Sequence, residues 1–134
     1  MSRQNIKLVR ALTDAGNRGD LDAFVALLSP DVVWEENPEL PGLREVYRGR
    51  AKVREWGEEV LEVVESPHSE LAEITELTDD RVFTETLVTG RGKASGVPVE
   101  LRYWSVLWLA EGKIARRQVF WTKDEALEAA GLRE

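Results

Sequence analysis

The sequence contains no cysteine and a single histidine among its 134 residues. The absence of cysteine excludes thiolate nucleophiles, disulfide bonds and cysteine-ligated metal centres. The histidine, His68, lies in a stretch that reads as a turn, and no Gly-x-Ser-x-Gly pattern occurs, so a serine–histidine–acid triad is not indicated. There is no glycine-rich phosphate loop and no spaced set of carboxylates, so we expect no metal and no cofactor. Any acid–base chemistry must therefore come from carboxylates, tyrosines or cations.

The chain is also short of basic residues and of long apolar runs. Its net charge of −7 argues against nucleic-acid binding, because a basic surface is needed to neutralise phosphates. The longest mostly apolar run, from Tyr103 to Ala110, is far too short to span a bilayer, and no basic and apolar leader opens the chain. The length suits one domain covering residues 1–134. We therefore expect a soluble, cytoplasmic protein that binds neither nucleic acid nor membrane.

Three helices are predicted in the first half of the chain. Apolar residues recur at helical spacing in residues 4–15 and again in residues 50–65. Between these two segments, Asp20 is a candidate N-cap for a short helix that Pro30 would stop. Residues 31–36 then read as a β-strand.

From Ser69 onward the apolar pattern changes to the alternation that is typical of β-strands. Turn signals divide this part into four strands, at about residues 70–78, 82–91, 97–110 and 114–122. A short helix at 123–130, capped by Gly131, closes the chain. The predicted fold class is therefore α+β, with helices packed on one face of a strongly curved antiparallel sheet.

Glu36 is the candidate catalytic residue in this sequence. Side chains alternate between the two faces of a strand, so Val32, Trp34 and Glu36 share one face of the strand at 31–36. A carboxylate that lies beside an indole in this way is a candidate general base. The alternative is that Glu36 faces water at the strand end or pairs with a cation such as Arg117, and is then structural.

The strand at 101–110 is apolar on both faces. Tyr103, Ser105, Leu107 and Leu109 form one row, while a second row holds tryptophans. If helices cover only one face of the sheet, the second row needs another cover. We expect a homodimer through this outer face, and the alternative is that the C-terminal helix or a loop covers it. The residues assigned to the predicted interface are Trp104, Val106, Trp108, Gln118 and Phe120.

Several short motifs resemble those of the SnoaL-like and ketosteroid-isomerase-like proteins. They are Gly-Asp-Leu-Asp at 19–22, Val-Ala-Leu-Leu at 25–28, the segment 31–38, Tyr-Arg-Gly-Arg at 47–50, Gly-Lys-Ile at 112–114 and the segment 125–132. The resemblance covers nearly the whole chain. It implies the conical α+β barrel of nuclear transport factor 2, in which helices and a concave sheet enclose a small-molecule pocket.

The resemblance also assigns roles to single positions. Glu36 stands where ketosteroid isomerases have their aspartate base. Their two oxyanion donors, a tyrosine and a protonated aspartic acid, correspond to Leu12 and Ser105 here, and this loss argues against steroid isomerisation. In the similar limonene-epoxide hydrolases, the water-holding tyrosine and asparagine correspond to Trp34 and Glu36. Their last-strand aspartate corresponds to Val119, so that water-activating set is not intact.

Hairpin register predicts one pocket on the concave face of the sheet. Its expected lining is Trp34, Glu36, Trp56, Tyr103, Ser105, Leu107, Arg117, Val119 and Trp121, with Glu85 as a second acid. Such a pocket suits a small apolar ligand that carries oxygens. Glu36 would act as general base, and Tyr103 or Arg117 would stabilise developing negative charge. The alternative for the aromatic residues is that they form core.

Two classes of function fit these expectations. In the first, the protein is a cofactor-free isomerase, cyclase, hydratase or hydrolase that acts on an apolar metabolite. In the second, it is a module for ligand binding or dimerisation that performs no chemistry.

Overall fold

The structure is a computed structural model, and it describes residues 2–36 and 46–131. Residues 37–45, which include the end of the 31–38 motif, and residue 132 of the last motif lie outside the described part. The elements follow in the order α1 (Ser2–Asn17), α2 (Leu21–Ala26), β1 (Leu28–Glu35), β2 (Val46–Arg48), α3 (Arg50–Val63), β3 (Val64–Thr78), β4 (Arg81–Gly92), β5 (Pro98–Ala110), β6 (Lys113–Phe120) and α4 (Lys123–Ala129).

The six strands of the described residues form one sheet in the order β2-β1-β6-β5-β4-β3. The neighbouring pairs are antiparallel except β1 and β6, which run parallel. The expectation of a purely antiparallel sheet was therefore wrong at this pair, and β2 was not predicted. A pairing between segments about eighty positions apart leaves no mark in local sequence, so periodicity does not reveal it.

The predicted helix around Phe24 ends earlier than expected, at Ala26 rather than next to Pro30. Asp20 caps it as predicted, since its carboxylate accepts a hydrogen bond of 3.0 Å from the backbone N–H of Ala23. The chain leaves the helix because Leu28 pairs with Ile114 of β6. Pro30 then lies where the register of β1 shifts, a position at which a strand tolerates a missing N–H.

The second misplaced boundary is the start of β3. The strand begins at Val64 rather than near residue 70, because the long hairpin of β4 and β5 offers partners as far as Gly92. His68, predicted to lie in a turn, therefore lies in a strand opposite Thr89, where it is exposed. The register shifts between Glu65 and His68, which accommodates the bend at the end of α3.

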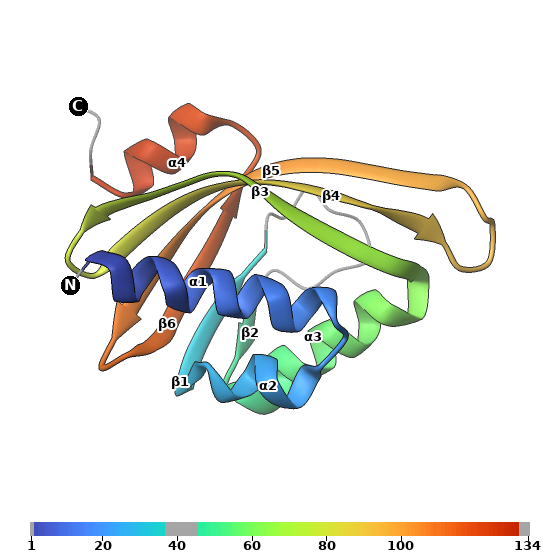
Figure 1. Cartoon of the computed structure of the whole chain (residues 1–134), viewed down its shortest axis with the longest axis horizontal. Helices are drawn as coiled ribbons and strands as arrows, with labels where there is room; N and C mark the ends of the chain where they lie inside the picture. Colours follow the sequence, from blue (N-terminus) through green and yellow to red (C-terminus); the bar gives the residue numbers. More distant parts are fainter. Residues whose placement is uncertain (1, 37–45, 132–134) are drawn as a thin grey trace.

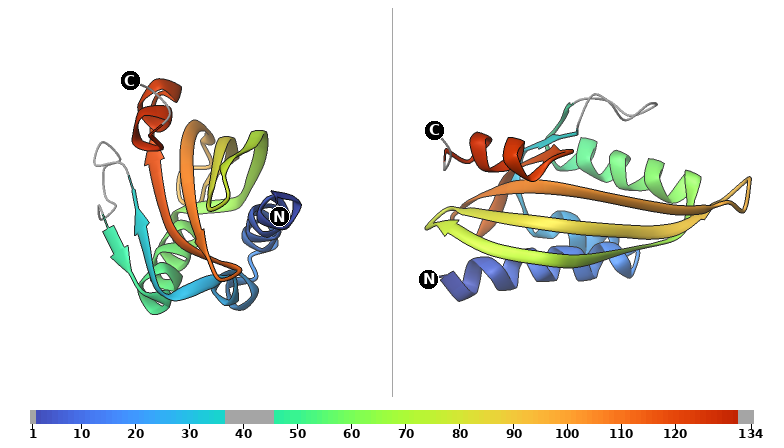
Figure 2. Two further views of the ribbon diagram at one scale, coloured as in Figure 1. Left: turned by 90° about the vertical axis from the view of Figure 1, so that its left-hand side faces the viewer. Right: turned by 90° about the horizontal axis from the view of Figure 1, so that it is seen from above.

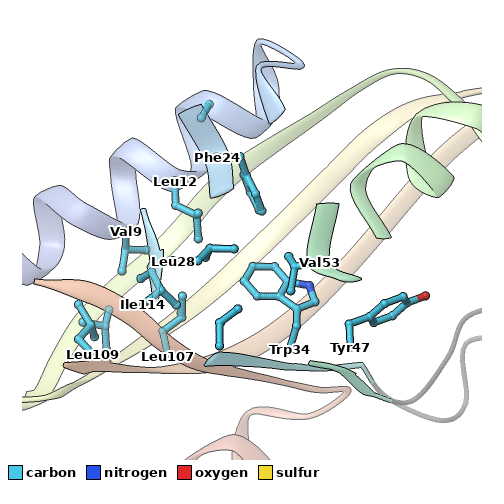
Figure 3. Packing of buried hydrophobic residues seen from close by; sticks show 13 residues of the cluster. Val9, Leu12, Phe24, Leu28, Trp34, Tyr47, Val53, Leu107, Leu109 and Ile114 are labelled. Carbon is cyan, nitrogen blue, oxygen red and sulfur yellow. The ribbon is translucent and has the colours of Figure 1, made fainter. Parts of the chain in front are cut away.

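Helices lie on both sides of the sheet, not on one side as predicted (Figure 1). The sheet curves around α1, α2 and α3, while α4 packs on the opposite face (Figure 2). The main core fills the concave side, where Trp34 of β1 lies beside Phe24 of α2 and Val53 of α3 (Figure 3). This arrangement leaves the concave face of β4, β5 and β6 opposite the helices, and the candidate site lies there.

A smaller core lies beneath α4 on the outer face. It joins Phe83 and Val106 of the sheet to Ala126 and Ala130. Val106 is fully buried in this way, so it cannot belong to a dimer interface, and the predicted alternative of a helix cover holds for it. Three aromatic side chains, Trp104, Trp108 and Phe120, are only partly buried beside α4. Dimerisation through these residues stays a prediction.

None of the described helices combines the length and apolar character that a membrane crossing requires. The cytoplasmic location stays a prediction from the sequence.

Candidate functional site

The concave face and the helices enclose a cavity of about 650 Å³. All nine side chains that the sequence predicted for its lining are found there: Trp34, Glu36, Trp56, Tyr103, Ser105, Leu107, Arg117, Val119 and Trp121. Apolar residues of α1, α3 and the distal part of β4 and β5 complete the wall. A cavity of this size and composition is typical of sites for small, mostly apolar molecules.

One ion pair lies inside this cavity. Trp34 of β1 stands opposite Arg117 of β6, so Glu36, which follows β1, comes within reach of the same arginine. Arg117 Nη1 donates a hydrogen bond of 3.1 Å to Glu36 Oε2. The two side chains are only 6% and 4% exposed, respectively. Glu36 therefore pairs with Arg117, and the pair is buried in the cavity rather than facing water.

Three aromatic rings surround the Arg117 guanidinium. Its central carbon lies 4.4 Å from the ring centre of Trp34 and 5.4 Å from those of Trp56 and Tyr103. Burial lowers the pKa of Arg117, but the negative charge of Glu36 and the interactions with Tyr103 raise it by more, so the pKa lies above its ordinary value. Arg117 is therefore a permanent cation held in a fixed position.

A row of hydroxyl groups forms a polar strip on the sheet side of the cavity. Thr84 and Ser105 are paired across β4 and β5, and their hydroxyl oxygens are 2.5 Å apart. The Thr86 hydroxyl donates to Thr84 Oγ1 at 3.5 Å. All three side chains are buried and line the cavity. Sequence reasoning missed Thr84 and Thr86, although their alternation with Phe83 and Glu85 carried the signal that they share a face.

The indole N–H groups of the cavity have no hydrogen-bond partner. Those of Trp34, Trp56 and Trp121 are buried, and none donates a hydrogen bond in the structure. Trp34 and Trp56 are also neighbours, with ring centres 5.2 Å apart. The site thus combines a cation and a carboxylate in aromatic surroundings.

Glu85 is the one predicted pocket residue that lies elsewhere. It stands opposite Trp104, whose row faces away from the cavity, and it forms an ion pair with Arg102. The prediction was wrong because the register of β4 depends on the length of the hairpin before β5. A different acid, Glu59 of α3, lines the cavity instead and accepts a hydrogen bond of 3.0 Å from the Tyr47 hydroxyl.

Comparison with known proteins identifies the family. The sequence pattern of the SnoaL-like domain matches residues 9–117. The chain belongs to the SnoaL-like family. This match includes both members of the buried ion pair and the cavity lining except Val119 and Trp121. No curated protein matches the sequence.

Solved structures share the fold. An NTF2-like protein of unknown function from Burkholderia pseudomallei K96243 has a TM-score of 0.79 at 20% identity, over 93% of this chain and 95% of that one. A protein described as a polyketide cyclase from Xanthomonas campestris pv. campestris has a TM-score of 0.74 at 24% identity, over 92% of this chain and 93% of that one. The third is SalBIII, an epoxide hydrolase/cyclase-like enzyme with a role in pyran ring formation in the polyether salinomycin. Its TM-score is 0.76 at 23% identity, over 92% of this chain and 94% of that one. The SnoaL-like chain therefore has the nuclear transport factor 2-like fold that its motifs implied.

Proposed function

We propose that this SnoaL-like protein is a cofactor-free acid–base enzyme whose cavity takes a small, apolar molecule with a carbonyl group. The observation that carries the proposal is the buried Glu36 carboxylate, which lies in an aromatic cavity beside a permanent cation. The fold is shared with proteins described as a polyketide cyclase and as an epoxide hydrolase/cyclase-like enzyme, and this likeness supports the general class of reaction.

In the proposed reaction, Glu36 removes a proton from the carbon next to the carbonyl. The electron pair of that carbon–hydrogen bond moves into the carbonyl group, so that negative charge develops on its oxygen. Arg117 stabilises this charge, and the Tyr103 phenol assists. Glu36 then returns the proton to a different carbon in an isomerisation. In a cyclisation the nucleophilic carbon attacks a second carbonyl carbon, and Glu36 gives its proton to the new alkoxide.

The ion pair serves both stages of this scheme. Glu36 accepts and returns the proton, while Arg117 offers positive charge 3.1 Å from its carboxylate. A guanidinium has five N–H donors, and only the one on Nη1 bonds to Glu36 in this structure, so the group can also contact a ligand oxygen. A carboxylate removes protons only slowly from an ordinary carbon acid, so a substrate with an activated carbon–hydrogen bond is required.

The test follows exchange of deuterium into 2-tetralone in heavy water, by proton NMR. The carbon between the carbonyl and the aromatic ring carries activated hydrogens. We expect wild-type protein to accelerate exchange above the buffer rate, Glu36→Gln to abolish the acceleration, and Glu36→Asp to keep part of it. Glu35→Gln is the matched control, because Glu35 is the next residue along the chain and pairs with Arg116 on the outer face. Exchange at the buffer rate with folded wild-type protein would exclude this function for this substrate class.

A non-catalytic ligand-binding module is the second candidate. The ion pair itself favours it, because Arg117 already neutralises the charge of Glu36 at 3.1 Å. Thermal unfolding separates the two functions. Stabilisation by 2-tetralone without any acceleration of exchange would identify a binding module, whereas the enzyme requires both.

A further inference from the structure

The cavity extends well beyond the pair of Glu36 and Arg117, along the hairpin arm of β4 and β5 (Figure 1). On β5 every second side chain faces inward, and five of these, from Val99 to Leu107, line the cavity. The Tyr103 ring lies beside the Arg117 guanidinium. A strand rises about 3.4 Å per residue, so the cavity continues for about 14 Å from Tyr103 to Val99. This part of the cavity, from Tyr103 to Val99, is called the distal half below.

The sheet side of the cavity changes from polar to apolar along its length. The cross-strand pairs of β4 and β5 near Arg117 carry hydroxyl groups, and those of the distal half carry none. In order, the pairs are Thr84–Ser105, Thr86–Tyr103, Val88–Leu101 and Gly90–Val99. The sheet therefore offers hydrogen bonds to one end of a ligand and hydrocarbon contacts to the other.

Several polar residues among the other lining side chains are already bonded or solvated. The Asn17 side-chain amide bonds to both the backbone N–H and the backbone carbonyl of Ser69, at 2.7 and 3.0 Å. Glu59 accepts its hydrogen bond from Tyr47, and Glu62 is exposed to water. The Ser69 hydroxyl, at the edge of the sheet, is the polar exception in the described lining of the distal half. This half of the cavity therefore suits hydrocarbon, because an apolar group gains by leaving water there and a polar group finds few partners.

The distal half ends where β3 crosses over Gly90. A Cβ atom at Gly90 would lie 2.7 Å from Val64 Cγ1 and 3.4 Å from Pro67 Cα, so this crossing leaves no room for a side chain. Val63, which precedes the crossing, is largely exposed to water. A ligand group that reaches past Gly90 therefore meets either a wall or solvent. It gains no further burial in the cavity.

We propose that the distal half is a subsite for a linear hydrocarbon tail, and that Gly90 and Val99 mark its length limit. The ligand is then elongated, with its polar head at Arg117 and its tail along β5. An extended chain advances about 1.2 Å per bond, so about 14 Å holds a tail of about eleven carbons. The chemical class is a medium-chain alkyl compound rather than a compact polycyclic one. This inference rests on the proposed function for the position of the head, and it adds the tail.

The experiment measures binding of the linear methyl ketones from 2-nonanone to 2-hexadecanone to the wild-type protein. The method is equilibrium dialysis with the free ketone quantified by gas chromatography. All members carry the same head, so only the tail length varies. Burial of one methylene raises affinity about fourfold, so the Kd should fall by about this factor for each added carbon up to 2-tridecanone. Beyond 2-tridecanone, whose tail has about eleven carbons by the same estimate, the Kd should stop falling.

A substitution at the end of the distal half should shorten this limit. Val99→Trp places a large ring where the end of the tail would lie, so 2-tridecanone should bind at least about tenfold more weakly, the effect of two or more methylenes. The shorter 2-nonanone should bind as it does to the wild-type protein, which also shows that the variant is folded. Glu100→Trp is the matched control, because it adds the same ring at the next position of β5, where the side chain is exposed on the other face. It should leave the binding of both ketones unchanged.

The outcomes separate this inference from the proposed catalysis. A length limit in wild-type protein that shows no deuterium exchange would support the tail subsite and contradict the general-base function. Exchange into 2-tetralone, together with Kd values that do not depend on tail length, would contradict the tail subsite alone. Equal weakening by Val99→Trp and Glu100→Trp, or a Kd that keeps falling at the same rate to 2-hexadecanone, would overturn it. Failure of every ketone to bind up to its solubility limit would overturn it as well.

Discussion

Glu36 and Arg117 are 81 positions apart in the chain, and their side chains meet at 3.1 Å inside the cavity. One position before each of them, Glu35 and Arg116 form a second pair, at 2.5 Å, on the outer face of the same two strands. The inner pair is buried, while the outer pair is partly exposed to water. Both are glutamate–arginine pairs at neighbouring positions, so comparing them measures the effect of burial on an ion pair.

The first prediction uses this comparison. Arg117→Met leaves a buried carboxylate without a partner, and we expect a loss of about 3–5 kcal/mol in the free energy of unfolding. Glu36→Gln with Arg117→Met should cost less than Arg117→Met alone, because no unpaired charge remains. In the outer pair the corresponding double-mutant cycle should give a coupling of about 1 kcal/mol or less. Urea unfolding measures both cycles, and an inner coupling no larger than the outer one would contradict the burial of the inner pair.

The second prediction concerns pH. The pKa of Arg117 lies above its ordinary value in the folded protein. A raised pKa adds stability that is fully present below the unfolded-state pKa and is lost only as pH rises through the folded-state value. Between about pH 7 and about pH 10, therefore, the stability difference between wild type and Glu36→Gln/Arg117→Met should stay constant. Urea unfolding across that range checks this, and a difference that shrinks steadily toward the alkaline end would mean that Arg117 loses its proton early.

The inner face of β5 could be predicted from its alternation, whereas the inner face of β6 could not be read from the hairpin that joins the two strands. Ala110 pairs with Lys113, and the two intervening residues, Glu111 and Gly112, both have positive φ, as a two-residue turn requires. Pairing continued from this turn would set Leu107 opposite Arg116, but the register shifts between Trp108 and Leu109, so that Leu107 pairs with Arg117. This shift, which the turn does not reveal, brings Arg117 to the concave face.

The face of β4 could not be predicted in the same way. Both of its rows mix apolar with polar residues, as Phe83 and Glu85 do on one side and Val82 and Thr84 on the other. Hydrophobicity therefore does not tell them apart, and a shift of one residue exchanges the faces. The parallel pairing of β1 with β6, which brings Glu36 to Arg117, is equally invisible because no local turn joins the two strands.

The hydroxyl row yields a third prediction. Ser105→Ala removes the 2.5 Å partner of the Thr84 hydroxyl and leaves it only the 3.5 Å contact with Thr86, so we expect a cost of about 1–3 kcal/mol. Ser105→Ala with Thr84→Val removes both polar groups and should cost less than the sum of the two single changes. Thr89→Val is the control on β4, since Thr89 is exposed, and it should change stability by about 0.5 kcal/mol or less. Urea unfolding measures all four variants, and strictly additive losses would contradict the hydrogen bond.

The fourth prediction returns to the outer face. We propose that a second copy of the chain covers Trp104, Trp108 and Phe120, which α4 leaves partly exposed. Ion pairs of Arg102 and Arg116 flank this row, as the polar rim of an interface flanks its apolar centre. A two-fold contact would place the same row of both copies together. Analytical ultracentrifugation at micromolar concentration should therefore give a dimer for the wild-type protein.

The matched variants for this interface are Trp108→Asp and Val63→Asp. Trp108 lies in the proposed contact, with the Arg116 guanidinium 4.6 Å from its ring centre. An aspartate at this position would remove the aromatic contact and bury a carboxylate in the interface, which should shift the protein to monomer. Val63 is an apolar side chain that is 63% exposed at the end of α3, away from this face, and its replacement should leave the dimer intact. A monomeric wild-type protein, or equal dissociation by both substitutions, would exclude this interface. In either case Trp108 would be covered only within a single chain, in part by its contact with Arg116.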